Sequence, residues 1–408
     1  MSPSTTHPSQ DPAAGLPVDT ARGATAADGF RAGGVTAGFK ESGTPDLALV
    51  VNDGPSTAAA AVFTTNRVAA APVHWSRQVV ADGSARAVVL NSGGANACTG
   101  PQGFQASHAT AEAIGEALGI GAGDVIVCST GLIGMQLPME VMRAGIGPVV
   151  ADTAADDAAG LRAARAVMTT DTVPKQAAHT SPEGWTVGGF AKGAGMLAPG
   201  LATMLVVLTT DAELPAGTLR RCLAEACSRT FERADSDGCM STNDTVALLA
   251  SGAARLAPDE LDFTRALTAV CHSLAQQLIT DAEGAAHDIT VTTFGAATEA
   301  EAAEVSRTVA RSNLFKTAIF GNDPNWGRVL SAVGTTAAQF DPEQLDVTIN
   351  GVTVCREGMI GDPREGVDLA SSRDVEVLID LRTGPHEATI WTNDLTHDYV
   401  EENSAYSS

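Results

Sequence analysis

A threonine at the junction of a flexible loop and an apolar run is the candidate nucleophile of this chain. Residues 190–210 read FAKGAGMLAPGLATMLVVLTT, so Thr203 follows a loop rich in Gly, Ala and Pro and precedes a β-branched, apolar segment. Such a loop can bend the Ala202–Thr203 peptide until the Thr203 hydroxyl reaches the preceding carbonyl. Cleavage there would free an α-amino group with an ordinary pKa of about 8, which can take the hydroxyl proton. The pattern predicts a self-cleaving N-terminal nucleophile, against the commoner alternative of a threonine that only packs.

A nucleophile that attacks a carbonyl group can carry out acyl transfer if two further kinds of group are present. These are hydrogen-bond donors for the developing oxyanion and charged groups that anchor the substrate. The segment STGLIG at 129–134 ends a predicted strand in a glycine turn, where a hydroxyl and a backbone N–H can lie side by side. Lys192 ends the strand before the loop, so a hairpin would bring its ammonium group near Thr203. A cation there would hold a carboxylate or ease the loss of a proton from the amine. From the residues alone, an ordinary turn and a solvated lysine are the competing interpretations.

Short blocks along the chain, all in one order, resemble those of a known enzyme family. They are KGAGM at 192–196 with ATML at 202–205, AVFTTN at 61–66, NSGGANACTG at 91–100, STGLIG at 129–134, MTTDT at 168–172, STNDT at 241–245, DAEGA at 281–285, GNDPNWGR at 321–328 and the terminal EENSAYSS. From about Gly29 to its end, the chain is therefore similar to the ornithine acetyltransferases, also called bifunctional glutamate N-acetyltransferases.

The resemblance implies roles for particular residues. Thr203 would be the nucleophile, freed by cleavage between Ala202 and Thr203, and Thr130 with Gly131 would form the oxyanion hole. The substrate-binding residues that it implies are Thr169, Lys192, Thr203, Glu283, Asn403 and Ser408. Thr170 stays open as an alternative to Thr169, and pairing of Glu283 with the δ-ammonium of ornithine is our own hypothesis. The chain departs from the usual wording of the family at Gly200, Cys239, Met240, Ala282, Ala286 and His287.

The reaction implied by the resemblance is acetyl transfer from N2-acetylornithine to L-glutamate in arginine biosynthesis. Thr203 would carry the acetyl group between two half-reactions, which gives ping-pong kinetics. No cofactor is expected, and acetyl-CoA stays open as a second acetyl donor. The alternatives are an amidase or aminopeptidase-type hydrolase on the same scaffold, an acyltransferase of secondary metabolism, and a small-molecule-binding protein without catalysis.

Composition and charge exclude several other classes of protein. The formal net charge of −23 over 408 residues disfavours nucleic acids and anionic membranes as partners, since both attract Lys and Arg. No apolar run approaches the roughly 20 residues of a membrane span. Seven cysteines without a CxxC pair and eight scattered histidines suggest neither a disulfide framework nor a metal site. We expect a reduced, cytoplasmic setting.

Periodicity predicts a mixed α/β chain in which the strand at 185–192 pairs with the strand at 204–210. Further strands are expected at 50–65, 85–93, 124–131, 288–294, 345–349, 374–380 and 386–392. Helices are expected at 105–119, 153–168, 215–230, 244–252, 262–280 and 300–313. Residues 1–28 are polar and are expected to form a disordered tail, followed by an α chain over 29–202 and a β chain over 203–408. The resemblance implies a two-lobed α/β fold with sheets sandwiched between helices, and entwined chains in an α2β2 heterotetramer.

Overall fold

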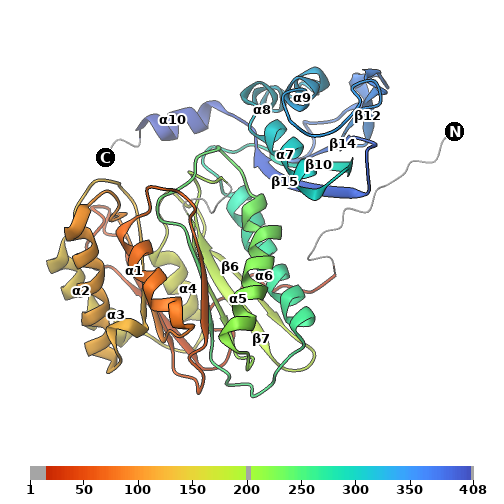
Figure 1. The fold of residues 1–408 in the computed structure, drawn as a ribbon. Helices are drawn as coiled ribbons and strands as arrows, with labels where there is room; N and C mark the ends of the chain where they lie inside the picture. Colours follow the sequence, from red (N-terminus) through yellow and green to blue (C-terminus); the bar gives the residue numbers. More distant parts are fainter. Residues whose placement is uncertain (1–14, 199–203, 406–408) are drawn as a thin grey trace.

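The structure is a computed structural model that describes residues 15–198 and 204–405. These residues form two lobes with three β-sheets (Figure 1). The larger lobe contains the chain up to the end of α6, and the smaller lobe, teal to blue in Figure 1, begins with β10. The predicted two-lobed α/β architecture is confirmed.

Two sheets lie face to face inside the larger lobe. The first has the order β1 (Phe30–Val35), β2 (Leu47–Asn52), β4 (Ala87–Ser92) and β5 (Val125–Thr130). The second has the order β3 (Ala59–Phe63), β9 (Thr245–Ala250), β8 (Leu205–Thr210), β7 (Thr186–Lys192) and β6 (Lys175–Thr180). The helices of this lobe are α1 (Ala71–Val79), α2 (Gly100–Leu118), α3 (Met139–Asp152), α4 (Asp157–Ala166), α5 (Ala216–Arg229) and α6 (Glu260–Thr280).

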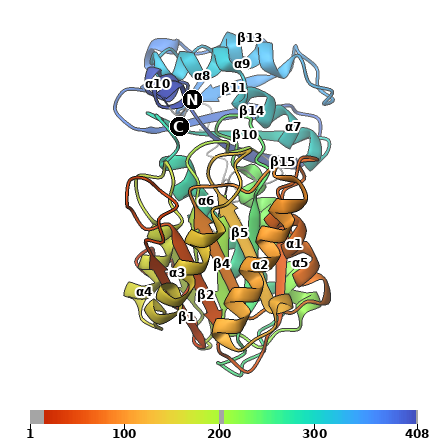
Figure 2. The same ribbon diagram turned by 90° about the vertical axis from the view of Figure 1, so that its left-hand side faces the viewer.

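The apolar runs of these strands are buried on both faces, which is why they read as continuous rather than alternating. In β8, Leu205 and Val207 face the first sheet, and Val206 and Leu208 face α5 and α6. On the opposite side, α2 and α3 cover the outer face of the first sheet (Figure 2). The result is a four-layered sandwich of helices, sheet, sheet and helices, in which each buried Leu or Val contributes roughly 1.5–3 kcal/mol.

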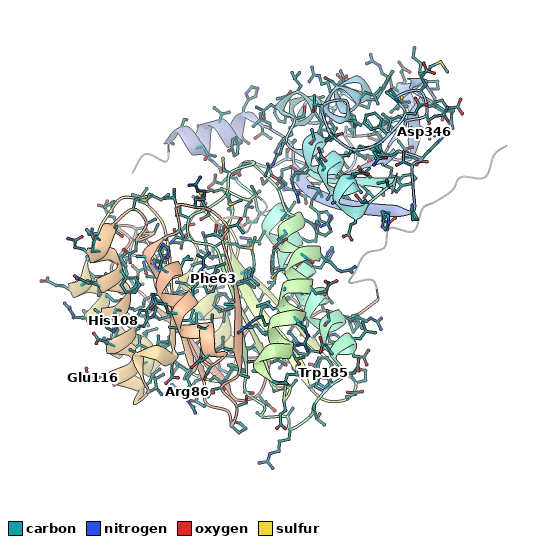
Figure 3. The ribbon with its side chains drawn as sticks, in the orientation of Figure 1. Phe63, Arg86, His108, Glu116, Trp185 and Asp346 are labelled. Carbon is teal, nitrogen blue, oxygen red and sulfur yellow. The ribbon has the colours of Figure 1, made fainter. Side chains whose placement is uncertain are left out.

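Aromatic packing adds to the outer layer of the second sheet. Trp185, labelled in Figure 3, lies just before β7 and is 2% exposed. Its ring packs against Phe263 of α6, with 5.7 Å between the ring centroids. With few aromatic residues in the chain, most of the core is built from Ala, Val and Leu, as the cluster around Trp185 illustrates.

The smaller lobe is one sheet with helices against one face. Its strands have the order β13 (Met359–Ile360), β12 (Val352–Arg356), β11 (Asp346–Ile349), β14 (Asp374–Asp380), β10 (Asp288–Ala296) and β15 (His386–Asn393). Its helices are α7 (Glu299–Ala310), α8 (Asn313–Phe320), α9 (Trp326–Val333) and α10 (His397–Ala405). The helix α10 leaves this lobe and extends over the end of the larger one (Figure 1).

The topology brings three predicted site segments to the same end of the larger lobe. The strands β4 and β5 are parallel, with Ser92 opposite Thr130, so their carboxyl ends meet at one edge. The strands β7 and β8 are antiparallel, with Lys192 opposite Leu205. Because Lys192 contacts Thr130, the ends of both pairs of strands meet.

The second sheet takes strands from both sides of residue 203. β3, β6 and β7 precede that residue, and β8 and β9 follow it. A cut before Thr203 would therefore leave both halves joined through one sheet, which is the entwined arrangement expected from the sequence. The lobes themselves divide near residues 281–287, so they do not coincide with the expected chains 29–202 and 203–408.

Two predictions of local structure are wrong. The helix expected at 244–252 is the strand β9, buried at every position between β3 and β8; a short apolar run buried on both faces has no periodicity that separates strand from helix. The expected tail over 1–28 is ordered from residue 15: Ala24 and Ala27 are buried, and Asp19 pairs with Ala178 of β6. Residues 1–14 lie outside the described part.

None of the helices in the described ranges combines the length and the apolar character that crossing a bilayer requires.

Candidate active site

A pocket of about 150 Å³ lies where α10 and the connection between the lobes meet the strand ends of the larger lobe. Every predicted site residue that the structure describes lines it: Thr130, Gly131, Thr169, Lys192, Glu283 and Asn403. These residues come from β5, the loop before β6, β7, the connection between the lobes, and α10. Thr170, the alternative to Thr169, lines it as well.

The predicted nucleophile, the cleavage site and the last substrate residue lie outside the described residues. These are Thr203, Ala202 and Ser408. The chain is described again from Met204, whose backbone N–H donates to Asp244 Oδ1 at 3.0 Å. Leu205 then pairs with Lys192, a lining residue, so β8 begins at the edge of the pocket.

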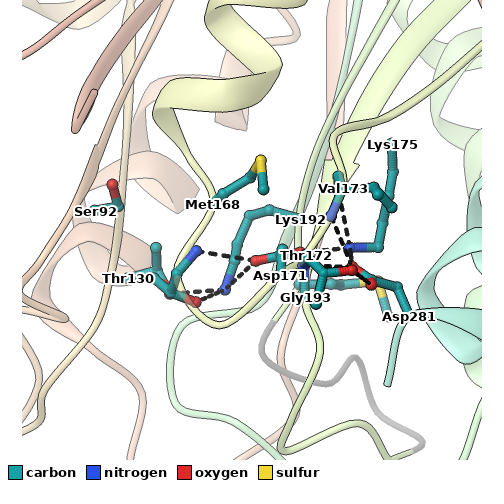
Figure 4. A network of polar contacts seen from close by, with 12 residues as sticks. Ser92, Thr130, Met168, Asp171, Thr172, Val173, Lys175, Lys192, Gly193 and Asp281 are labelled. Carbon is teal, nitrogen blue, oxygen red and sulfur yellow. Dashed lines mark hydrogen bonds and ion pairs between the residues drawn. The ribbon is translucent and has the colours of Figure 1, made fainter. Parts of the chain in front are cut away.

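Lys192 is a buried cation whose ammonium group points at two hydroxyl groups. Its side chain is 2% exposed, and Nζ donates to Thr169 Oγ1 at 2.9 Å. It also donates to Thr130 Oγ1 at 3.3 Å (Figure 4). Burial lowers the pKa of Lys192, and the carboxylate of Asp171 opposes that effect. An ammonium has three hydrogens, and the third has no hydrogen-bond acceptor among the described residues. It is available to an anion in the pocket.

Thr130 and Gly131 present donors to the pocket. An ammonium can only donate, so Thr130 Oγ1 accepts from Lys192, and its own O–H hydrogen is free to donate. The N–H of Gly131 has no acceptor within the described ranges. The carbonyl of Thr130 accepts from the N–H groups of Gly93 and Gly94 at 2.9 and 3.0 Å, which fixes the turn. A hydroxyl and an amide from adjacent residues that line one pocket are the kind of donors that can stabilise a developing oxyanion.

Gly131 is required at this turn for two reasons. Its φ is +127°, and a Cβ there would lie 2.6 Å from the nitrogen of Gly94. We expect Gly131→Ala to lower the free energy of unfolding by about 1–3 kcal/mol, because a clash with backbone adds to the strained φ. The matched control is Gly134→Ala, where φ is +87° but nothing lies within 4 Å of the added Cβ. Denaturant unfolding of both variants checks this, and equal losses would contradict the clash.

Glu283 and Asn403 form the side of the pocket nearest the smaller lobe. Asn403 Nδ2 donates to Glu283 Oε2 at 2.9 Å, and the N–H of Glu283 donates to the carbonyl of Ala194 at 2.9 Å. A Cβ on Gly195 would lie 2.4 Å from Glu283 Oε2, so a glycine at that position lets the carboxylate approach the loop backbone. This side of the pocket therefore carries a charge opposite in sign to that of Lys192.

Sequence reasoning missed part of the lining. Asn243 lines the pocket and its Nδ2 donates to the carbonyls of Ala95 and Ser129 at 2.6 and 2.8 Å, joining the two sheets beneath the site. The STNDT block that contains Asn243 marked the segment but not this role. His287, a departure from the family wording, lies in a buried pair with Asp394 at 2.7 Å and does not line the pocket.

Among the described residues, no group of three His, Cys, Asp or Glu side chains is arranged to hold a metal ion.

A model of the ArgJ family matches residues 31–408. This chain belongs to the ArgJ family. The finding confirms the resemblance on which the sequence-based interpretation rested.

ArgJ relatives carrying the name arginine biosynthesis bifunctional protein match over nearly the whole chain. The protein from Streptomyces avermitilis is 62% identical over 94% of this chain and 99% of its own length. That from Thermobifida fusca is 58% identical over the same shares, and that from Mycobacterium tuberculosis is 54% identical over 95% of this chain and 97% of its own.

A crystal structure of ornithine acetyltransferase complexed with ornithine, from Mycobacterium tuberculosis, aligns with 47% of this chain and 100% of that chain. The identity is 55% and the TM-score is 0.45. Membership of the ArgJ family rests on the family model and on the full-length relatives.

Proposed function

We propose that this chain is an acyltransferase of arginine biosynthesis that moves an acetyl group from N2-acetylornithine to L-glutamate. Its ArgJ relatives are named as bifunctional proteins of that pathway. The observation that carries the proposal is one pocket that gathers a buried cation, two oxyanion donors and a carboxylate where β8 begins. A cation opposite a carboxylate suits a substrate with a carboxylate at one end and an ammonium at the other.

The first step is self-cleavage. Thr203 Oγ attacks the carbonyl carbon of Ala202, the C–N bond breaks, and the hydroxyl proton passes to the nitrogen of Thr203. Water then hydrolyses the resulting ester, which leaves a carboxylate on Ala202 and restores the hydroxyl group. The products are residues 1–202 and 203–408, and Thr203 now carries a free α-amino group as its base.

Acetyl transfer follows in two half-reactions. Thr203 Oγ attacks the acetyl carbonyl of N2-acetylornithine while its amine takes the hydroxyl proton and returns it to the leaving nitrogen of ornithine. The amine of glutamate then attacks the acetyl-threonine ester, and the Thr203 hydroxyl is regenerated with N-acetylglutamate as the second product. Thr130 and Gly131 donate to the acetyl oxygen as it becomes negative.

The anchors hold the two ends of the substrate. Lys192 would bind the α-carboxylate of the substrate with its available hydrogen, and Thr169 would orient the ammonium group of Lys192. Glu283 would pair with the δ-ammonium of ornithine, with Asn403 holding its carboxylate. These steps need no cofactor, and acetyl-CoA is a further candidate donor. We also propose a cytoplasmic α2β2 heterotetramer.

The charge of Lys192 gives a pH dependence. Its pKa is lowered by burial, so the ammonium loses its proton, and its hold on the carboxylate, below the pH near 10.4 at which an exposed lysine titrates. We expect kcat/KM for N2-acetylornithine to fall on the alkaline side through that lowered pKa. Lys192→Arg keeps its charge and should move the fall to higher pH, whatever its absolute rate. The pH profiles of both proteins check this, and identical alkaline limbs would contradict it.

Initial rates with both substrates varied test the function. Parallel double-reciprocal lines and release of ornithine without glutamate, limited to one equivalent, are expected for a ping-pong transferase. Continuous acetate release that ignores glutamate would instead indicate the hydrolase. Transfer to a different amine in preference to glutamate would indicate the acyltransferase of secondary metabolism, and binding without either reaction would indicate a binding protein.

A further inference from the structure

Behind the pocket, four side chains of alternating charge form a buried row: Lys192, Asp171, Lys175 and Asp281 (Figure 4). Lys175 Nζ lies 2.7 Å from Asp171 Oδ1 and 2.6 Å from Asp281 Oδ2. Lys192 Nζ lies 3.9 Å from Asp171 Oδ2. The side chains of Asp171 and Lys175 are fully buried. Neither contributes to the pocket lining, so the proposed reaction leaves this pair without a role.

Asp171 also fixes the two backbone segments that carry the anchors. Its Oδ1 accepts from the N–H of Gly193 at 2.6 Å, and its Oδ2 accepts from the N–H of Thr169 at 3.0 Å. Gly193 follows Lys192 directly, so one carboxylate joins the end of β7 to the loop that holds the Thr169 hydroxyl. Its negative charge is strongly stabilised: burial alone would raise the pKa of Asp171, but Lys192, Lys175 and these hydrogen bonds bring it to about 2.

We propose that Asp171 is a positioning residue of the acetyl-transfer site, which keeps Lys192 charged and directed at Thr130 and Thr169 while leaving its third hydrogen free for the substrate carboxylate. This inference rests on the proposed function for its consequence in catalysis. The chemistry it describes is recognition of a carboxylate by a buried ammonium whose counter-charge lies 3.9 Å away, beyond hydrogen-bond distance.

The distances explain why Asp171 does not accept a hydrogen bond from the ammonium group of Lys192. Asp171 is bound tightly by Lys175, at hydrogen-bond distance, and only loosely by Lys192. An opposite charge at about 4 Å still stabilises a buried cation strongly, because little water screens it. A direct hydrogen bond would use the donor that the substrate needs. Lys175 therefore keeps the Asp171 carboxylate from forming a direct hydrogen bond with Lys192, and Asp281 balances the charge of Lys175.

Other charged groups around Lys192 act in both directions. Glu283 and Asp244 favour its charged form, and Lys175 disfavours it. Lys40, whose Nζ donates to the carbonyl of Met168, lies close enough for mutual repulsion with Lys192. Asp171 outweighs each of these charges in its effect on Lys192, so its removal should have the largest consequence.

The test uses two variants that should move the pKa of Lys192 in opposite directions. Asp171→Asn keeps the size of the side chain and loses the charge, so we expect that pKa to fall by about 1–3 units. Lys175→Met removes a neighbouring positive charge and should raise it. The pKa is read by NMR titration of lysine labelled with carbon-13, with the Lys192 signal assigned through its absence in Lys192→Arg.

The activity of the same proteins adds a second readout. In Asp171→Asn, KM for N2-acetylornithine should rise by a larger factor than kcat falls. Lowering the pH should restore KM, because it returns the proton to Lys192. A merely structural defect would not be corrected by a change of pH. If the pKa of Lys192 shifts in the same direction in both variants, or does not shift, the proposal is overturned. If Asp171→Asn does not fold, the shift in Lys175→Met decides alone. Because the titration needs no turnover, absence of acetyl transfer in the wild-type protein would contradict the proposed function and leave this result intact.

Discussion

Thr203→Ala is expected to leave the chain uncut at 41.5 kDa and to abolish acetyl transfer. Alanine removes the hydroxyl group that attacks the Ala202 carbonyl and that later carries the acetyl group, so both reactions lose their nucleophile. The loss in kcat should be on the order of 10⁶-fold, the scale that removal of a serine nucleophile produces. Denaturing electrophoresis, followed by an assay of ornithine release, measures both effects.

The matched control for this variant is Thr203→Ser, which retains a hydroxyl group at the same position. It should still be cut and should transfer acetyl at a measurable rate. Thr209→Val supplies a second control, since Thr209 is a buried threonine of β8 whose hydroxyl donates to the carbonyl of Ala24, away from the pocket. Cleavage and transfer that persist in Thr203→Ala would contradict the assignment of the nucleophile.

Thr130→Val should lower kcat by about 10²–10³-fold with a smaller change in KM. Valine has nearly the shape of threonine but cannot donate to the acetyl oxygen, and the loss of one such donor typically has this magnitude. The effect on kcat exceeds the effect on KM because the donor acts on charge that develops only in the transition state. Steady-state kinetics of the first half-reaction, with N2-acetylornithine as donor, measure it.

Thr130→Ser is the control that keeps the hydroxyl, and it should retain most of kcat. Valine at position 130 also takes one hydrogen-bond acceptor from Lys192, which keeps Thr169 as the other. A variant in which KM rises while kcat is unchanged would assign Thr130 to substrate anchoring through Lys192 and would contradict the oxyanion role.

Local patterns were sufficient for most of the elements that hold the site. The end of β5 in a glycine turn and the pairing of β7 with β8 follow from apolar runs that meet glycine-rich loops, and both are present in the structure. The strand β9 was predicted as a helix because its burial between two strands is a tertiary property. The sequence TVALLA alone does not indicate that this segment has a neighbouring strand on each side.

The anchors illustrate a second limit. Lys192, Thr169 and Glu283 were named from their blocks, and the structure brings them to one pocket. The residues that support them were not named: Asp171 and Lys175 lie four positions apart, a spacing that on its own would indicate only a local ion pair. Their role depends on Lys192 and Asp281, which are distant along the chain and near in space. Supporting contacts of this kind follow from the fold rather than from spacing.

The most direct test of the account is the intact mass of the wild-type protein under denaturing conditions, before and after incubation with N2-acetylornithine in the absence of glutamate. We predict two polypeptides, residues 1–202 and 203–408, with one acetyl group added to the second after incubation and removed when glutamate is supplied. A single uncut chain of 41.5 kDa, or two chains that never take up an acetyl group, would contradict Thr203 as an N-terminal nucleophile.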